Sequence, residues 1–282
     1  MKKILITGKN SYVGKSLEKW LGKYLGKYSL SSVSLRTDSW KEKEFSGYDV
    51  VFHVAGIAHI KETKENAELY YKVNRDLTYE VAHKAKSEGV KQFIFLSSMS
   101  VYGIESGVIN RKSPLNPKSN YGKSKLEAEE LIKPLENEKF KVAIVRPPMI
   151  YGKGCKGNYV RLAKFALITP VFPDIENKRS MIYIDNLSEF VKILIDGYNS
   201  GTFFPQNSEY VRTSELVKSI AEMHEKNIWL TRLFNPLLRL LKGSTLNKVF
   251  GDLVYEKGMS ENESPYYICD FYSSISMTER GK

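Results

Sequence analysis

The sequence predicts an α/β fold in which a parallel β-sheet is covered by helices on both faces. Apolar runs of strand length alternate with helical segments along the N-terminal part of the chain, as expected for parallel strands joined by right-handed crossovers. The first strand, 3–7, is followed by Gly8 and by a helical pattern from about Val13. A strand, a glycine turn and a helix together form the phosphate-binding unit of dinucleotide folds. We therefore expect ligands beyond the carboxyl ends of the strands.

Composition limits the classes of partner. The 282 residues, 42% of them hydrophobic, suffice for one large core or for one domain with a smaller lobe. The net charge of +11 admits nucleic acid, an anionic membrane or a phosphorylated ligand. No nucleic-acid-binding motif or Arg-rich run accompanies this charge, so no nucleic-acid partner is expected. The two cysteines cannot form a disulfide framework and the four histidines show no ligand spacing, so we expect no metal and a reducing cytoplasm.

The turn after the first strand carries an incomplete glycine pattern. Gly8 and Gly14 frame this turn, and Ser11 stands where the middle glycine of the usual three would be. A pyrophosphate can still bind there if the backbone of Ser11 has an ordinary turn geometry. The alternative is a strand-to-helix turn without a ligand.

The end of the second strand bears on cofactor choice. This strand is predicted over 29–35 and is followed by Arg36, Thr37 and Asp38. In dinucleotide folds an acid at this place accepts hydrogen bonds from the adenosine ribose, whereas an arginine pairs with a 2′-phosphate. Arg36 therefore favours NADP(H), and Asp38, two positions later, leaves NAD(H) open.

Two further strands complete the pattern. The segment 49–56 is typical of a buried strand, and it ends in Ala55 and Gly56, small residues that let a cofactor approach the backbone. His53 is interpreted as a packed strand residue. A helix over 67–89 carries Asn74, and the next apolar strand, 91–96, is followed by Ser97 and Ser98.

The helix that begins with Tyr121-Gly122-Lys123-Ser124-Lys125 supplies a candidate acid–base pair. Strong helix formers follow, and residues four apart project from the same face, so Tyr121 and Lys125 can act on one substrate atom. A phenol titrates at about pH 10 and needs a positive charge beside it to exchange protons near neutrality. Lys125 can supply that charge together with a cofactor cation. A solvated surface pair is the default alternative.

In this order the motifs resemble those of the extended short-chain dehydrogenase/reductases, and the resemblance covers nearly the whole chain. It rests on Thr7-Gly8 to Gly14, 49–55, Ser97-Ser98 with Val101-Tyr102-Gly103, Tyr121 to Lys125, Arg146 to Gly152, and Arg179 to Leu187. It implies a Rossmann-type doubly wound sheet over 1–150, with a return contribution from about 180–204. A smaller C-terminal α/β substrate-binding lobe is then formed by 151–179 and 205–282. Ser11 departs from the family's glycine pattern.

The resemblance assigns catalytic roles. It implies that Ser98 holds the substrate carbonyl or hydroxyl, Tyr121 transfers the proton, and Lys125 lowers the pKa of Tyr121 while bonding the nicotinamide ribose. Donors aimed at the oxygen stabilise the alkoxide that hydride transfer creates. Ser97 could be a strand-end hydrogen-bonding residue without a catalytic role. The expected cofactor-binding residues are Gly8, Asn10, Ser11, Tyr12, Val13, Arg36, Ala55, Gly56, Asn74, Tyr121, Lys125 and Pro148.

The glycine-rich basic loop 152–158 precedes a helix expected from Tyr159. A helix entrance combined with cations suits a diphosphate, and a flexible basic loop is the alternative. In sugar-nucleotide members of the family, residues resembling Asn158 and Arg179 contact the substrate pyrophosphate, and 171–173 lies near the base. Cys155 is interpreted as incidental. The expected substrate-binding residues are Ser98, Asn158, Arg161, Phe172 and Arg179.

Within the family, 141–152 and 249–255 look most like the bacterial capsule and O-antigen reductases of UDP-linked 4-keto-6-deoxy-N-acetylhexosamines. This likeness implies NADP(H)-dependent reduction of the C4 ketone of a UDP-2-acetamido-2,6-dideoxy-4-hexulose, to UDP-N-acetylfucosamine or UDP-N-acetylquinovosamine. The alternatives are a UDP-sugar 4-epimerase that retains NAD and a non-catalytic dinucleotide-binding redox sensor or scaffold. A monomer or a homodimer is expected.

The segment 228–242 is both apolar and basic. Such a stretch can lie on an anionic membrane, dock on a membrane-bound pathway partner, or pack on the lobe, and Pro236 interrupts or begins a helix there. The N-terminal apolar run is too short for a signal peptide and no stretch is long enough to span a bilayer. We expect a cytoplasmic enzyme, with peripheral contact at the inner face of the membrane left open.

Overall fold

The computed structural model describes residues 1–58, 60–233, 235–236, 247, 249–261 and 264–281. The chain divides into two compact units. The first consists of Met1–Gly103, Pro114–Pro147 and Leu187–Pro205, and the second of Ile104–Ser113, Pro148–Asn186 and Gln206–Lys282. The segment 104–113, expected in the first domain, belongs to the second unit because strand β5 (Gly107–Ile109) pairs with β12 (Leu253–Tyr255).

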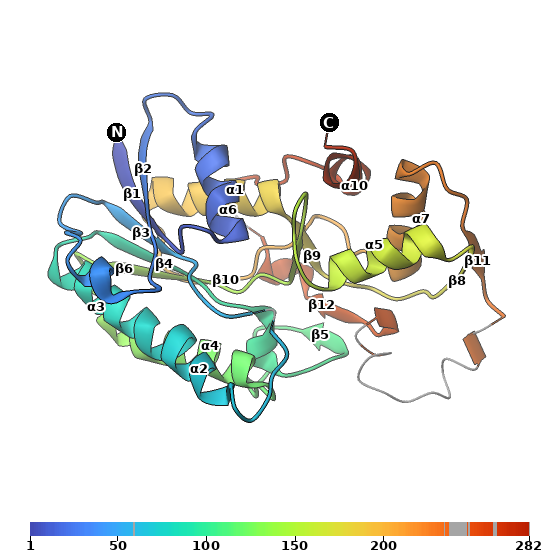
Figure 1. Cartoon of the computed structure of the whole chain (residues 1–282), viewed down its shortest axis with the longest axis horizontal. Coiled ribbons are helices and arrows are strands. Elements are labelled where there is room, and N and C mark those ends of the chain that lie inside the picture. Colours follow the sequence, from blue (N-terminus) through green and yellow to red (C-terminus); the bar gives the residue numbers. More distant parts are fainter. Residues whose placement is uncertain (59, 234, 237–246, 248, 262–263, 282) are drawn as a thin grey trace. The chain divides into compact units, whose positions relative to one another are not determined.

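The first unit contains a six-stranded sheet in the order β10-β6-β4-β3-β1-β2, with parallel pairing throughout (Figure 1). Its strands are β1 (Lys2–Thr7), β2 (Tyr28–Val33), β3 (Val50–His53), β4 (Gln92–Leu96), β6 (Lys141–Val145) and β10 (Gly201–Phe203). The predicted Rossmann-type parallel sheet is confirmed. The strand β1 has β2 on one side and β3 on the other, so the chain reverses its direction of travel there. At such a topological switch point a crevice opens beyond the carboxyl ends of the strands.

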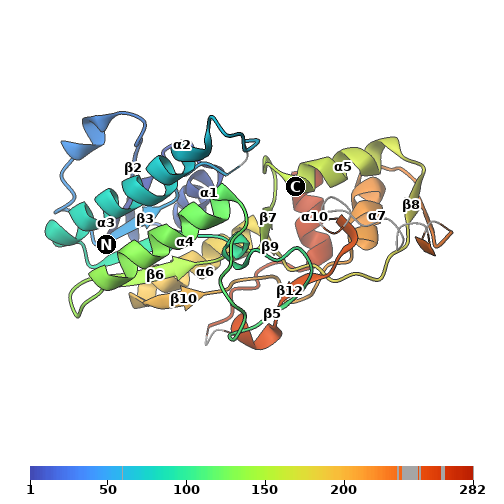
Figure 2. The same ribbon diagram turned by 90° about the horizontal axis from the view of Figure 1, so that it is seen from below.

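Helices cover both faces of this sheet. Helices α1 (Tyr12–Leu21) and α6 (Ile184–Gly197) lie on one face, and α2 (Ala67–Tyr71), α3 (Leu77–Ser87) and α4 (Asn120–Ile132) on the other (Figures 1 and 2). Strand residues such as Leu5, Val51 and Phe93 are fully buried against the second set of helices. The short 3₁₀ helices are Asp38–Lys41, Met99–Tyr102, Lys133–Leu135 and, in the second unit, Lys257–Met259.

The helix predicted over 67–89 is not uniform. A π-helical turn, Lys72–Asp76, separates α2 from α3 and contains Asn74. π turns within helices occur frequently at functional sites, and this one turns the side chain of Asn74 into the interior, where it is fully buried.

The second unit is built on three two-stranded parallel ladders. They are β12 with β5, β7 (Met149–Tyr151) with β9 (Met181–Tyr183), and β8 (Val171–Pro173) with β11 (Trp229–Thr231). The helices of this unit whose bounds lie within the described residues include α5 (Asn158–Ile168), α7 (Thr213–Met223) and α10 (Phe271–Glu279). The helix expected from Tyr159 thus begins one residue earlier.

The segment 228–242 is described only in part. Residues 229–231 form strand β11, and Asn235 and Pro236 are helical, whereas 234 and 237–242 lie outside the described residues. None of the helices in the described ranges combines the length and the apolar character needed to cross a bilayer.

Candidate active site

The turn after β1 closely approaches the end of β3. Gly8 has a φ of +88°, in the left-handed region that favours glycine. A Cβ at Gly8 would lie only 3.0 Å from the backbone nitrogen of Ala55. Two predicted cofactor residues, Gly8 and Ala55, therefore lie against each other at the switch point, where dinucleotide folds bind their ligands.

Ser11 fits the turn without strain. It caps α1 with an ordinary extended backbone (φ −72°, ψ 145°), and its Oγ accepts a hydrogen bond from the Gly14 nitrogen at 3.0 Å. A Cβ at Gly14 would lie 2.5 Å from Ser11 Oγ and 3.0 Å from Ile6 Cγ2, so this position requires glycine. Ser11 therefore has the ordinary backbone geometry that pyrophosphate binding at this turn was expected to need. The N-terminus of α1 can still direct backbone N–H groups at a pyrophosphate.

The other predicted cofactor residues of the glycine turn, Asn10, Tyr12 and Val13, lie between Gly8 and the first turn of α1. Asn10 is exposed, and Tyr12 and Val13 are half-buried in the first turn of α1. The backbone nitrogens of Gly8 and Lys9 both donate to the Val33 carbonyl, at 2.9 and 3.2 Å, which ties the loop to the end of β2. Arg36 follows three residues beyond that end and is exposed.

The side chain of Asn74 is hydrogen-bonded to two other segments of the protein. Its Oδ1 accepts from the Ile57 nitrogen at 2.8 Å, and its Nδ2 donates to the Ile57 carbonyl at 3.0 Å and to Ser124 Oγ at 3.1 Å. Both ends of the Asn74 amide therefore have hydrogen-bond partners within the protein. Asn74 therefore joins the loop after β3 to helix α4, and its contact with a cofactor stays a prediction.

The start of α4 is capped twice. Ser119 Oγ accepts from the Gly122 nitrogen at 3.1 Å, and the Glu62 carboxylate accepts from the nitrogens of Asn120 and Tyr121, each at 3.0 Å. A carboxylate at a helix N-terminus satisfies unpaired N–H groups and complements the helix dipole. This capping fixes the backbone that carries Tyr121. The sequence gives no local sign of Glu62, because it lies on the loop after β3.

Ser98 and Tyr121 come together. Ser98 Oγ accepts from the nitrogen of Ser100 at 3.1 Å and from its hydroxyl at 3.0 Å, so the Ser98 hydroxyl proton is available for donation. Its hydrogen bond with the phenol of Tyr121 lowers the phenol's pKa, but burial has the larger effect and raises that pKa overall. Lys125, which was expected to lower the pKa of Tyr121, is not among the groups that shift this pKa in the protein without a cofactor. The lowering remains a prediction for the site with a cofactor cation.

Lys125 is buried one turn along the same helix. Only 5% of it is exposed, its Nζ donates to the Leu96 carbonyl at 2.8 Å, and it lies 4.5 Å from the centroid of the Phe95 ring. Burial lowers the pKa of Lys125 to about 7, and the Glu129 carboxylate opposes that effect. Ser98, Tyr121 and Lys125 are thus gathered at the carboxyl end of β4.

A buried network of hydrogen bonds links residues that neighbour these three, on α4 and at the ends of β4 and β6. Ser97 Oγ donates to Glu129 Oε1 at 2.5 Å, and Glu129 also accepts from the Arg146 guanidinium. Arg146 Nη1 donates to the Tyr102 hydroxyl at 3.0 Å. Ser97 therefore has the structural role suggested for it. Glu129 and Arg146 were not predicted, although Glu129 stands one helical turn after Lys125 and Arg146 belongs to a family motif.

The predicted substrate residues of the second unit lie in different environments. Asn158 begins α5 and Arg161 follows one turn later, both exposed, after Gly157 with a φ of +94°. Arg179 Nη1 donates to the Gly251 carbonyl at 3.1 Å, and burial lowers its pKa. Phe172 is only 6% exposed and packs on Phe250, with ring centroids 5.7 Å apart. Pro148 is buried just before β7. The exposed start of α5 can receive an anion, Phe172 packs on Phe250, and the substrate contacts expected of these residues stay predictions.

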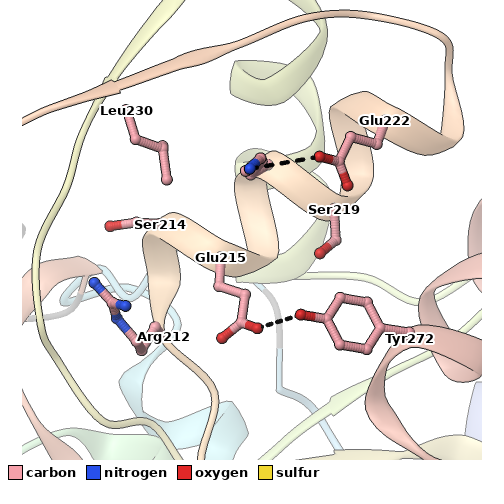
Figure 3. A pocket seen from close by; sticks show the side chains of 8 residues that line it. Arg212, Ser214, Glu215, Ser219, Glu222, Leu230 and Tyr272 are labelled. Atoms are coloured by element: carbon pink, nitrogen blue, oxygen red, sulfur yellow. Dashed lines mark hydrogen bonds and ion pairs between the residues drawn. The ribbon is translucent and has the colours of Figure 1, made fainter.

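A cavity of about 270 Å³ in the second unit contains none of the predicted residues (Figure 3). Its lining residues are Arg212, Ser214, Glu215, Lys218, Ser219, Glu222, Leu230 and Tyr272. Its charged groups bind neighbouring side chains: Tyr272 donates to Glu215 at 2.5 Å and Lys218 lies 3.7 Å from Glu222. The lining of this cavity has no arrangement like that of Ser98, Tyr121 and Lys125 at the end of β4.

Comparison with known proteins agrees with this geometry. The model of the NAD dependent epimerase/dehydratase family matches residues 4–203. The chain is 31% identical over 256 residues to UDP-glucose 4-epimerase of Vibrio cholerae, covering 81% of this chain and 77% of that protein. It is also 31% identical over 169 residues to N-acetyl-alpha-D-glucosaminyl-diphospho-ditrans,octacis-undecaprenol 4-epimerase of Escherichia coli O157:H7, covering 57% of this chain and 49% of that protein.

Solved structures share the fold. UDP-glucuronic acid 4-epimerase from Bacillus cereus, in complex with NAD, superposes with a TM-score of 0.76 at 18% identity and covers 99% of this chain and 97% of that one. A dTDP-4-dehydrorhamnose reductase from Clostridium acetobutylicum gives 0.74 at 21% identity, with 98% of both chains covered. Together with the family match and the gathered Ser98, Tyr121 and Lys125, these findings show that the chain belongs to the NAD dependent epimerase/dehydratase family, the extended short-chain dehydrogenase/reductases.

Proposed function

We propose that the chain is an NAD(P)-dependent oxidoreductase that reduces the C4 ketone of a UDP-2-acetamido-2,6-dideoxy-4-hexulose. The observation that carries hydride chemistry at a carbonyl is the hydrogen bond between Ser98 and Tyr121 at the carboxyl end of β4, with Lys125 one turn along α4. The choice of a reductase rests on the likeness of 141–152 and 249–255. Two hydroxyl donors that meet at one point can both reach a single carbonyl oxygen. Such donors stabilise the negative charge that develops on the oxygen as the carbonyl carbon accepts hydride.

Each residue has a defined part in this reaction. The nicotinamide cofactor, when bound, supplies the hydride. Ser98 donates a hydrogen bond to the C4 oxygen and fixes its position. Tyr121 transfers its phenolic proton to that oxygen. Lys125, when protonated, is proposed to stabilise the phenolate that remains, because it is a buried cation one turn from Tyr121 along α4.

The cofactor is proposed to be NADP(H). Arg36 is exposed beyond β2, and β2 is tied to the glycine turn through Val33. A guanidinium there can pair with a 2′-phosphate. The solved B. cereus epimerase holds NAD, so NAD(H) is the competing cofactor.

The diphosphate of the substrate is proposed to bind at the N-terminus of α5. Asn158 and Arg161 are exposed in its first turn, where backbone N–H groups and a cation both favour an anion. Arg179 is proposed as a further contact. The diphosphate occurs in UDP-sugars and also in polyprenol-linked sugars such as the one in the name of the E. coli relative.

A second candidate is a UDP-sugar 4-epimerase that retains NAD. It is favoured by the V. cholerae relative, which aligns over 81% of this chain. Oxidation and re-reduction at C4 would use the same Ser98, Tyr121 and Lys125, so the catalytic residues do not separate the two reactions.

The deciding experiment measures oxidation of NADPH, and separately of NADH, by the purified protein with enzymatically prepared UDP-2-acetamido-2,6-dideoxy-4-hexulose. Turnover with a preference for NADPH supports the ketoreductase, and NMR of the product then gives the C4 configuration. Absence of turnover with both cofactors rejects it. The epimerase is tested by release of bound NAD on denaturation and by interconversion of UDP-glucose and UDP-galactose.

A further inference from the structure

Helix α5 leads to strand β8, which pairs with β11, at one end of the second unit (Figures 1 and 2). Five large apolar side chains on these elements and just beyond β11 are exposed. We call these residues the apolar tip. They are Phe165 (54% exposed), Ile168 (76%), Val171 (37%), Trp229 (81%) and Leu233 (84%). Single exposed apolar residues are normal on protein surfaces, but a contiguous group usually marks an interaction site.

The strand pairing places two of the five side chains next to each other. Val171 and Trp229 are in register in the β8–β11 ladder, so both project from the same face. Phe172, which points to the other face, is packed on Phe250 and nearly inaccessible. One face of this ladder is therefore packed, whereas the other exposes apolar side chains to solvent. Polar residues are expected on the solvent-facing side of a sheet.

Helix α5 and the chain after β11 extend this face. Phe165 and Ile168 are three residues apart on α5 and share its outer side. The Trp229 nitrogen donates to the Pro170 carbonyl at 2.8 Å, which joins the end of α5 to β11. Leu233 lies two residues beyond β11, with its nitrogen bonded to Thr231 Oγ1. The five residues of the apolar tip therefore lie on segments that are joined to one another by strand pairing and by the hydrogen bond between Trp229 and Pro170.

Basic side chains accompany the tip. Lys164 is exposed on α5, the Lys226 ammonium donates to the Leu167 carbonyl at the end of that helix, and Arg232 lies between Trp229 and Leu233 in sequence. Arg232 binds Asp174 and Glu176 through its guanidinium, so Lys164 and Lys226 carry the attraction for anions. Trp, Leu and Ile flanked by Lys are the composition of segments that lie in a membrane interface. The sequence remains apolar and basic as far as Lys242, and the whole chain carries a net charge of +11.

We propose that the apolar tip inserts into the headgroup region of an anionic lipid bilayer and holds the second unit at the membrane surface. The highly exposed side chains of Trp229, Leu233 and Ile168 suit the interfacial layer, and the lysines suit its negative potential. A bilayer is favoured over a protein partner because these highly exposed apolar side chains are accompanied by the exposed Lys164 and by Lys226, which complement anionic lipid headgroups.

Docking has a consequence for the site proposed above, and this step rests on the proposed function. Helix α5 runs from Asn158, at the proposed diphosphate site, to Ile168 in the tip. Its 11 residues correspond to about 16 Å at 1.5 Å per residue. A diphosphate bound there would lie within reach of a lipid-linked carrier at the membrane surface.

The test is sedimentation of the full chain with vesicles of equal phosphatidylglycerol and phosphatidylcholine, compared with vesicles of phosphatidylcholine alone. The protein binds the anionic vesicles, and added salt weakens the binding. The double variant Trp229→Ser/Leu233→Ser loses about tenfold in affinity. Leu25→Ser is the matched control, because Leu25 is 94% exposed in the first unit, and it leaves binding unchanged.

Three results would overturn the proposal: no binding of the unaltered chain to anionic vesicles, equal binding by the double variant, or loss of a solution dimer in that variant, which would assign the tip to contact between copies. Circular dichroism and the melting temperature show whether each variant is folded. The charge variant Lys164→Glu provides an independent check, since it weakens vesicle binding without removing an apolar group. These readouts need no substrate, so they are independent of the proposed reaction.

Discussion

The Arg146 guanidinium binds both carboxylate oxygens of Glu129, through Nε at 3.0 Å and Nη2 at 2.5 Å, and the Glu129 side chain is fully buried. This bidentate pair joins the end of β6 to α4, the helix that carries Tyr121 and Lys125. Glu129 also accepts from Ser97, the residue before Ser98. The pair therefore supports all three proposed catalytic residues without touching a reacting atom.

Replacing Glu129 by Gln is expected to lower the free energy of unfolding by about 3 kcal/mol, because a buried guanidinium loses its countercharge. The variant also removes the group that raises the pKa of Lys125, so this pKa falls below about 7. Since the protonated lysine is the active form, the alkaline limb of the kcat/KM profile moves to lower pH. The exposed neighbour Glu130→Gln is the control. An unshifted profile in a folded Glu129→Gln variant would reject the electrostatic role.

Replacing Tyr121 by Phe removes the proposed proton donor and retains the ring. We expect kcat to fall by about a thousandfold, within the usual range for loss of a general acid, while NADPH binding measured by fluorescence is unchanged. Tyr79→Phe, at an exposed position of α3, should behave as the unaltered enzyme. Undiminished turnover by Tyr121→Phe would reject the assignment of Tyr121 as the proton donor.

Gly56→Ala tests the close packing at the end of β3. The added Cβ would lie 2.9 Å from Asn74 Oδ1 and 3.4 Å from Lys125 Nζ. Because the Asn74 amide is held by Ile57 and Ser124, we expect a loss of about 1–2 kcal/mol in unfolding free energy and a raised KM for the cofactor. Gly47→Ala is a matched control, since nothing lies within 4 Å of its added Cβ. Equal behaviour of the two variants in denaturant and kinetics would contradict this account.

Arg36→Ala tests cofactor selection. We expect KM for NADPH to rise by about tenfold or more, because a charge-assisted contact with the 2′-phosphate is lost, whereas KM for NADH changes little. Lys9→Ala, which removes another exposed cation near the glycine turn, is the control for general charge. A parallel rise for both cofactors would show that Arg36 does not read the 2′-phosphate.

His53 should make stability depend on pH. Its Nε2 donates to Thr78 Oγ1, whose own proton goes to the Asn74 carbonyl, and its Nδ1 accepts from Thr7 Oγ1 at 2.8 Å. The ring is therefore neutral, and burial lowers the pKa of His53 from 6.5 to about 3. Below pH 6.5 the unfolded chain binds a proton that the folded chain does not, so stability falls as pH falls from 6.5 towards 3.

This effect amounts to about 2 kcal/mol between pH 7 and pH 5, at about 1.4 kcal/mol per pH unit. Urea unfolding of the unaltered chain and of His53→Gln at both pH values isolates the contribution of His53 to the pH dependence of stability, because glutamine does not titrate. His83→Gln, at an exposed position of α3, serves as the control. The same pH dependence in the unaltered chain and in His53→Gln would contradict the buried neutral ring.

The sequence by itself determined the local part of this structure. Strand segments such as 3–7 and 91–96, the glycine turn and the Tyr121–Lys125 spacing depend on periodicity and on residues close in the chain, and these are properties that a sequence displays directly. The order of the motifs then identified the family.

The tertiary structure decided what depends on distant residues and on burial. It turned Asn74 inward through a π turn, covered Phe172 with Phe250, and paired Glu129 with Arg146. It also placed the carboxylate of Glu62 at the start of α4. None of these contacts has a local signature, because each one exists only when separate segments pack and exclude water, and that packing also sets the pKa values of Lys125 and His53.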